Sequence, residues 1–178
     1  SGPYVTFLPQ DPHQNIVYRA YTLFSELLGQ RGISLPGLRM KLCKQLPICS
    51  GLGSSAASVV ASVVALDAVM GCPLCEQDKL DLMGRLEGEI SGSVHYDNVA
   101  PCYYGGLQLI IGENGLISKT LPDFDKWFWV SCFPGIKVST REAREILPQS
   151  YVRRDTINYA RRLAAFVDAC HRGDERTA

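Results

Sequence analysis

The sequence is most informative between residues 47 and 57, which read Pro47-Ile48-Cys49-Ser50-Gly51-Leu52-Gly53-Ser54-Ser55-Ala56-Ala57. Small residues in this stretch leave the backbone uncovered by side chains. The apolar segment 56–70 follows and predicts a helix that ends at Gly71 and Pro73. A glycine-rich loop at the start of a helix offers unpaired N–H groups and the positive end of the helix dipole. The stretch therefore predicts an anion site, and phosphate is the common biological anion of this size.

Two familiar phosphate loops fit this stretch poorly. A Walker loop needs Lys-Ser or Lys-Thr after its last glycine, whereas Gly53 is followed by two serines. A dinucleotide fingerprint, G-x-G-x-x-A, needs a buried parallel strand before it. The preceding segment 38–42 alternates apolar and basic residues, which predicts a strand with one face in water. The nearest acid for the fingerprint, Asp67, falls inside the predicted helix. A loop that only begins a helix and binds nothing is the remaining alternative.

Composition excludes several classes of function. The 178 residues carry 18 basic and 18 acidic side chains, and no basic stripe predicts a nucleic-acid partner. The longest apolar run, 56–70, is too short for a membrane span and contains Asp67. Seven cysteines, an odd number, favour reduced thiols over a disulfide framework and predict a cytoplasmic location.

The periodicity of apolar residues predicts a mixture of helices and strands without regular alternation, so the expected class is α+β. Predicted helices are 15–29, 56–70, 78–91, 139–148 (from a capping box of Ser139 and Glu142) and 156–171; predicted strands are 38–42, 107–111, 116–119 and 127–133, with a hairpin turn at Asn114-Gly115. A polar turn near Pro122 predicts two domains, 1–121 and 122–178. In the last helix we expect five residues to face inward: Ile157, Ala160, Leu163, Ala164 and Val167.

Glu87 is the second informative residue. On its predicted helix it shares a face with Met83 and Ile90. A carboxylate on an apolar face costs on the order of several kcal/mol unless it is paired or binds a metal. Mg²⁺ takes oxygen ligands of this kind beside nucleotide phosphates. Glu87 therefore suits a metal ligand, although an acid at the edge of the face that pairs with Arg85 or Arg161 fits the pattern equally well.

A polar cluster follows this helix on a predicted loop. The segment 91–101 reads Ser-Gly-Ser-Val-His-Tyr-Asp-Asn-Val-Ala-Pro and places His95, Asp97 and Asn98 within four positions. No second histidine lies nearby, so a metal triad is disfavoured. Recognition of a small polar substrate is the favoured interpretation. The alternative is that Asp97 and Asn98 only close a turn.

These motifs resemble the kinases grouped as galactokinase, homoserine kinase, mevalonate kinase and phosphomevalonate kinase. Their phosphate loop is similar to Pro-x-x-x-Gly-Leu-Gly-Ser-Ser-Ala, which Pro47 to Ala56 matches in register. The segments 86–106 and 134–148 look like the homoserine kinases in particular. The similarity runs from about Leu8 to about His171.

The resemblance implies a two-domain small-molecule kinase fold. The chain would hold an incomplete amino-terminal domain like domain 2 of ribosomal protein S5 and the start of a ferredoxin-like carboxy-terminal domain. The implied activity is ATP-dependent phosphorylation of the side-chain hydroxyl of L-homoserine, a step toward threonine, in an enzyme that could be a homodimer. A kinase of another small alcohol and a non-catalytic nucleotide-binding or interaction module are the alternatives.

By the same resemblance, Pro47 to Ala57 would wrap the phosphates of ATP. Ser55, with Ser54 as a second candidate, would give a hydroxyl to Mg²⁺, and Glu87 would be its carboxylate ligand. Phosphoryl transfer depends mainly on positioning and charge stabilisation, so a strong base is not required.

The resemblance also implies a substrate site. His95 and Asp97 would hold the amino-acid substrate, with Asp97 suited to its ammonium group. Arg144 would bind the substrate carboxylate through a bidentate fork. Asn98 lies close to the position where some relatives carry an aspartate base, which makes it a candidate catalytic residue together with Ser55 and Glu87.

Two departures from the family pattern stand out. Cys49 occupies a position where the motif often has glycine. The family's upstream Ser/Ala/Asn-rich segment and its late Gly-Ser-Gly-Pro-like loop do not occur in these 178 residues. We therefore expect the middle part of a homoserine kinase, with weak activity on its own.

Overall fold

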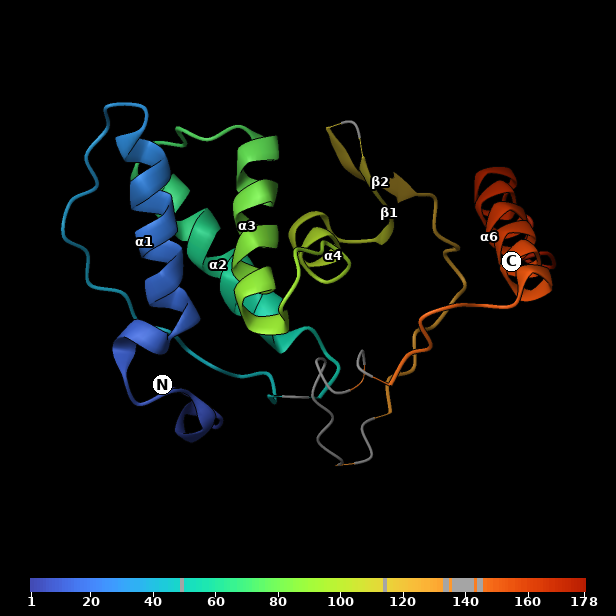
Figure 1. Cartoon of the computed structure of the whole chain (residues 1–178), viewed down its shortest axis with the longest axis horizontal. Coiled ribbons are helices and arrows are strands. Elements are labelled where there is room, and N and C mark those ends of the chain that lie inside the picture. Colours follow the sequence, from blue (N-terminus) through green and yellow to red (C-terminus); the bar gives the residue numbers. More distant parts are fainter. Residues whose placement is uncertain (49, 114, 133–134, 136–142, 144–145) are drawn as a thin grey trace.

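A computed structural model describes residues 1–48, 50–113, 115–132, 135, 143 and 146–178. Three long helices lie side by side at the amino-terminal end, and a hairpin follows them along the chain before a last helix (Figure 1). The elements in order are η1 (Val5–Phe7), η2 (Pro12–Gln14), α1 (Ile16–Gly29), α2 (Ser54–Val69), α3 (Glu76–Ser91), α4 (Val99–Tyr104), β1 (Leu107–Glu113), β2 (Leu116–Leu121) and α6 (Arg153–Arg172). The predicted α+β class is confirmed.

Helix α2 occupies the centre of the main core, as its apolar sequence predicts. It packs against α1 on one side and α3 on another. The large apolar side chains that are fully removed from water in these three helices are Phe24, Leu28, Val59, Val63, Leu82, Met83 and Leu86. Burial of each such side chain stabilises the fold by roughly 1.5–3 kcal/mol. This apolar packing fixes the place of α2, whose first turn follows the glycine-rich stretch.

The other two long helices also lie close to their predicted bounds. Helix α1 begins after Asn15, whose side-chain oxygen accepts a hydrogen bond of 3.0 Å from the backbone N–H of Val17. Helix α3 begins at Glu76, two residues before the predicted start. Arg19 of α1 and Glu89 of α3 form an exposed ion pair of 2.7 Å, which contributes at most about 1 kcal/mol. Packing therefore outweighs surface charge in holding these helices together.

The predicted hairpin is confirmed. Strands β1 and β2 are antiparallel, Leu107 pairs with Leu121, and the register shifts between Ile110 and Glu113. Both strands run two residues beyond their predicted ends. Asn114 of the predicted turn lies outside the described residues.

Two predicted strands are wrong. Residues 38–42 are not a strand, because a strand needs a partner ladder. Among the described residues, the nearby pairing is with Ser1: its ammonium donates to the carbonyl of Leu42, and its carbonyl accepts from the N–H of Lys44, at 2.7 Å each. Residues 127–132 form no strand either, and the side chains of Phe128 and Val130 are about nine-tenths exposed. Phe133, the last residue of that prediction, lies outside the described residues.

Helix α6 confirms the predicted last helix, but the prediction of its inward face is largely wrong. Ile157, Ala160, Leu163 and Ala164 are exposed, because in the described chain α6 meets the rest of the molecule near its carboxy-terminal end. There Cys170 is buried with Leu121 and Phe124 in a small second core, and Val167 packs against it.

The hairpin lies between the two cores. Ile117 belongs to the main core, whereas Leu107, Leu109 and Leu121 belong to the second one. The proposed domains 1–121 and 122–178 stay a prediction. Most of the predicted helix 139–148, with its capping box, lies outside the described residues. Within the described ranges, no helix combines the length and apolarity that a membrane crossing requires.

Gly84 on α3 provides a test of this packing. A methyl group at Gly84 would overlap Tyr96 Cε1 and lie 2.9 Å from Tyr96 Cδ1. Gly84→Ala should therefore lower the free energy of unfolding by roughly 1–3 kcal/mol, although alanine is the better helix former. At Gly29, the exposed last residue of α1, nothing lies within 4 Å, so Gly29→Ala should be neutral or stabilise by up to about 1 kcal/mol. Urea denaturation measures both, and an unchanged Gly84→Ala variant would contradict the close packing.

Candidate functional site

The glycine-rich loop, residues 47–53, ends at the first residue of α2. Gly53 is the N-cap of that helix and has φ +65°, in the left-handed region that favours glycine. Within the loop, Ser50 Oγ donates a hydrogen bond of 2.9 Å to the carbonyl of Pro47. Gly51 and Leu52 are exposed, so this part of the loop is open to a ligand. Cys49 lies outside the described residues.

Behind the loop lies a buried lysine that the sequence patterns did not single out. Only 5% of Lys44 is exposed. Its Nζ donates to the carbonyl of Ser54 and, at 2.7 Å, to Ser58 Oγ. Burial lowers the pKa of the Lys44 ammonium, and the negative charge of Glu87 opposes that shift in part. The two hydrogen bonds place the Lys44 side-chain nitrogen beside the first turns of α2.

Ser55 and Glu87 meet across two helices. Ser55 Oγ donates a hydrogen bond of 2.9 Å to Glu87 Oε2, and only 5% of Glu87 is exposed. The structure thus brings together the two residues predicted to bind a metal, one from the second position of α2 and one from α3.

These two side chains fit Mg²⁺, which prefers hard oxygen ligands and is usually held by one or two carboxylates together with substrate phosphates. In the part of the chain that the structure describes, no group of three or more His, Cys, Asp and Glu side chains is arranged to hold a metal ion. A hydroxyl and a single carboxylate beside a phosphate loop match the mode in which Mg²⁺ binds with a nucleotide, rather than a cage made by the protein alone.

The segment with His95 and Asp97 lies against α3. Tyr96, between them, places its ring next to Gly84 and donates a hydrogen bond of 3.4 Å from its hydroxyl to Asp81 Oδ1. Burial is the main cause of the raised pKa of Tyr96. His95 Nδ1 and Asp97 Oδ1 are 2.6 Å apart, and 60% of the Asp97 side chain is exposed. The pair therefore presents a carboxylate that a polar ligand can reach.

Gly84 and Glu87 lie three residues apart on α3, which places them on one face of that helix. Tyr96 packs on that face at Gly84. The loop and the buried carboxylate thus meet at the first turn of α2, and the polar segment lies against α3, the helix that carries Glu87.

The structure describes Asn98 but not Arg144, the two remaining residues of the predicted substrate site. The predicted loop 91–101 is partly helical, because α4 begins at Val99 with Asn98 as its N-cap. The Asn98 side chain is half-buried and makes no capping hydrogen bond. Arg144 lies outside the described residues, so its assignment as the carboxylate ligand rests on the sequence alone.

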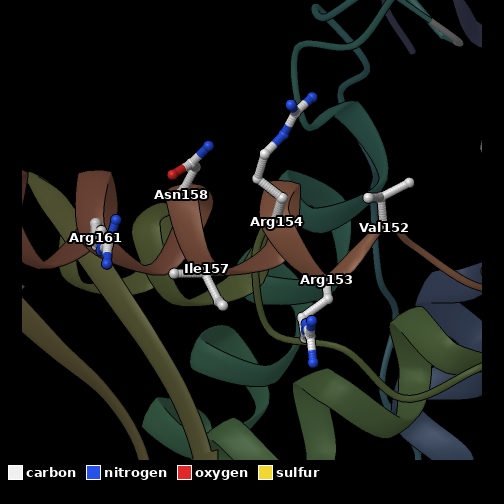
Figure 2. A pocket seen from close by; sticks show the side chains of 6 residues that line it. All are labelled: Val152, Arg153, Arg154, Ile157, Asn158 and Arg161. Atoms are coloured by element: carbon white, nitrogen blue, oxygen red, sulfur yellow. The ribbon is translucent and has the colours of Figure 1, made fainter.

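A surface depression among the described residues lies away from this site. It has a volume of about 400 Å³ and is lined by Val152, Arg153, Arg154, Ile157, Asn158 and Arg161 at the start of α6 (Figure 2). The side chain of Arg154 is 83% exposed, and Arg154 and Arg153 extend in opposite directions (Figure 2). No predicted site residue lines it, so we build the candidate site from the loop and Glu87.

The backbone of Gly53 gives a test of the anion site. Valine at φ +65° is strained, so Gly53→Val should lower the free energy of unfolding by roughly 1–2 kcal/mol and weaken binding of inorganic tripolyphosphate about tenfold or more. Gly32 has φ +74° and equally open space around it, after α1. Gly32→Val should therefore lose similar stability and keep tripolyphosphate affinity. Calorimetry on folded variants measures both; equal affinities in the two variants would remove the loop from the anion site.

Two comparisons with known proteins identify the family of the chain. Residues 15–106, more than half of the chain, match the family model described as GHMP kinases N terminal domain. The chain is also similar to the crystal structure of homoserine kinase from Cytophaga hutchinsonii ATCC 33406, with a TM-score of 0.77 and 32% identity. That similarity covers 94% of this chain and 52% of the other, so the chain spans about half the length of that enzyme. The chain belongs to the GHMP kinase family.

Proposed function

We propose that this chain carries the nucleotide site of an ATP-dependent kinase that phosphorylates the side-chain hydroxyl of L-homoserine to O-phospho-L-homoserine, in threonine biosynthesis. The observation that carries the proposal is the 2.9 Å hydrogen bond between Ser55 Oγ and Glu87 Oε2, directly after a glycine-rich loop. Family membership supports a kinase that uses ATP. The choice of homoserine is supported by the name of the structural neighbour and by the sequence segments 86–106 and 134–148.

The loop is suited to the phosphates of ATP. Its glycines keep side chains away from the backbone, and the N–H groups at the start of α2 lack partners within the helix. The helix dipole adds about half a positive charge at that end. Together these features favour a polyanion placed over residues 51–55.

Ser55 and Glu87 would hold Mg²⁺ beside the phosphates. When bound, the ion neutralises the negative charge that develops on the transferred phosphoryl group. The hydrogen bond between the two side chains keeps Glu87 Oε2 close to the start of α2. Because Glu87 is buried, the orientation of its carboxylate is restricted. Electrostatic catalysis requires charged groups that are preorganised in this way.

His95 and Asp97 are proposed to bind the amino-acid substrate. Asp97 offers an exposed carboxylate that can pair with the substrate ammonium group, and His95 Nδ1, 2.6 Å away, restrains its orientation. Arg144 is proposed for the substrate carboxylate. Asn98 has an amide side chain, which cannot accept a proton as a base does, so its proposed contribution is hydrogen bonding.

Glu87→Gln tests the metal ligand. The substitution keeps the side-chain volume and removes the charge, so kcat should fall about 10²-fold and more Mg²⁺ should be needed for half-maximal rate. Glu89→Gln, two residues along α3, removes only the exposed ion pair with Arg19 and should keep normal kinetics. ADP release by the purified protein measures the kinetics of both variants. A loss below about tenfold at every Mg²⁺ concentration would argue against Glu87 as a ligand.

Asp97→Asn tests the substrate site. Without the carboxylate, the KM for L-homoserine should rise about tenfold or more while the KM for ATP stays unchanged, because a charge-assisted contact to the ammonium group is lost. The same protein and assay give both constants. If the KM for ATP rises instead, Asp97 belongs to the nucleotide site. Phosphorylation of other small alcohols in preference to homoserine would refute the proposed substrate.

A further inference from the structure

Lys44 is the most buried charged side chain near the glycine-rich loop that the proposed function leaves unexplained. It precedes the loop by three residues, and Lys41, on the same segment, is exposed. A buried ammonium is costly unless its protons have acceptors. Lys44 has two: the carbonyl of Ser54 and Ser58 Oγ, the latter at 2.7 Å.

Both acceptors belong to the first turns of α2, which follow the loop in the sequence, whereas Lys44 precedes it. A second hydrogen bond joins the two ends of the loop: Ser54 Oγ donates to the carbonyl of Leu46 at 3.1 Å. The segment before the loop is thus bonded twice to Ser54, the residue that follows the loop. Such closure restricts the backbone dihedrals available to the described loop residues, 47, 48 and 50–53, and lowers the entropy that they must lose when a ligand binds.

The position of the Lys44 charge also favours a bound anion. A cation near a helix N-terminus is unfavourable, because that end of the helix already carries partial positive charge. Burial lowers the pKa of Lys44, whereas Glu87, which carries the opposite charge, raises it. An anion bound at the start of α2 would relieve the repulsion. Fastening and charge therefore both favour a bound polyphosphate.

We propose that Lys44 is a positioning residue of the nucleotide site, which fastens the two ends of the glycine-rich loop and holds its backbone in the shape that receives the polyphosphate. The inference rests on the proposed function, since it needs a phosphate ligand at this loop. Lys44 acts through Ser54 and the loop, and no contact between Lys44 and the ligand is required.

The test compares Lys44→Met with Lys41→Met in the chain as described. Methionine keeps the length of the lysine stem and removes the charge and all three donors. Affinities for inorganic tripolyphosphate and for adenosine are measured by displacement of a fluorescent ATP analogue. For Lys44→Met we expect tripolyphosphate to bind about tenfold more weakly and adenosine to bind within about twofold of wild type. Lys41→Met should match wild type for both.

Hydrogen exchange supplies a readout that does not depend on the ligand. Backbone amides of residues 45–57 should exchange faster in Lys44→Met than in wild type, while those of α1 and α3 stay unchanged. If Lys44→Met does not fold, Ser58→Ala takes its place, because it keeps the lysine and removes one acceptor. Ser58→Ala should weaken tripolyphosphate binding about threefold and speed the same amides.

The outcomes separate the two proposals. A folded Lys44→Met or Ser58→Ala variant with wild-type tripolyphosphate affinity and wild-type exchange would overturn the role of Lys44 alone. Equal losses for tripolyphosphate and adenosine would also overturn it, because general destabilisation of the site affects both. If neither ATP nor tripolyphosphate displaces the fluorescent ATP analogue from the wild-type protein, the proposed nucleotide site itself is wrong.

Discussion

The hydrogen bond between Ser55 and Glu87 is the constraint on which the arrangement of the site depends. A carboxylate that is only 5% exposed must have a polar partner, and here a hydroxyl on the second residue of α2 is one such partner. Apolar packing between α2 and α3 supplies most of the stabilising free energy, but the hydrophobic effect is not directional. The hydrogen bond adds a directional contact between the same two helices. The core therefore holds the helices together, and Glu87 sets which turn of α2 lies beside α3.

Small residues on α2 and α3 allow neighbouring segments to approach these helices closely. On α3, Gly84 receives the ring of Tyr96, and a Cβ at Gly88 would lie 3.1 Å from the backbone nitrogen of Val94. On α2, Ser58 and Ser62 are buried and donate to carbonyls one turn earlier. Among the described residues, every fully buried side-chain nitrogen or oxygen has a hydrogen-bond partner. The site can therefore be both polar and buried without unsatisfied groups.

The local patterns of the sequence were sufficient for the long helices, the hairpin and the glycine-rich loop, because periodicity, capping and turn residues act within a few positions. Glu87 could be found because an acid on an apolar helix face is conspicuous. Lys44 was missed, yet it has a signal: it continues the alternation of Leu38, Met40 and Leu42, so the lysine stands in an apolar register of the sequence. The two wrong strands and the exposed face of α6 depend on partners distant in the chain, which alternation along one segment cannot reveal.

The charges around α2 have an order that fits a metal–nucleotide complex better than a simple anion. The helix N-terminus and the Lys44 ammonium make one side of the first turn positive, and the Glu87 carboxylate makes the side that faces α3 negative. A bare phosphate would be attracted by the first side and repelled by the second. A polyphosphate that carries Mg²⁺ has both signs of charge, so the loop could hold its phosphates and Glu87 its cation. Ser55 is hydrogen-bonded to that carboxylate, so the positive and negative sides of the first turn meet at Ser55. The geometry that places Glu87 in the core is therefore better matched to the proposed magnesium complex of a nucleotide than to a phosphate ion.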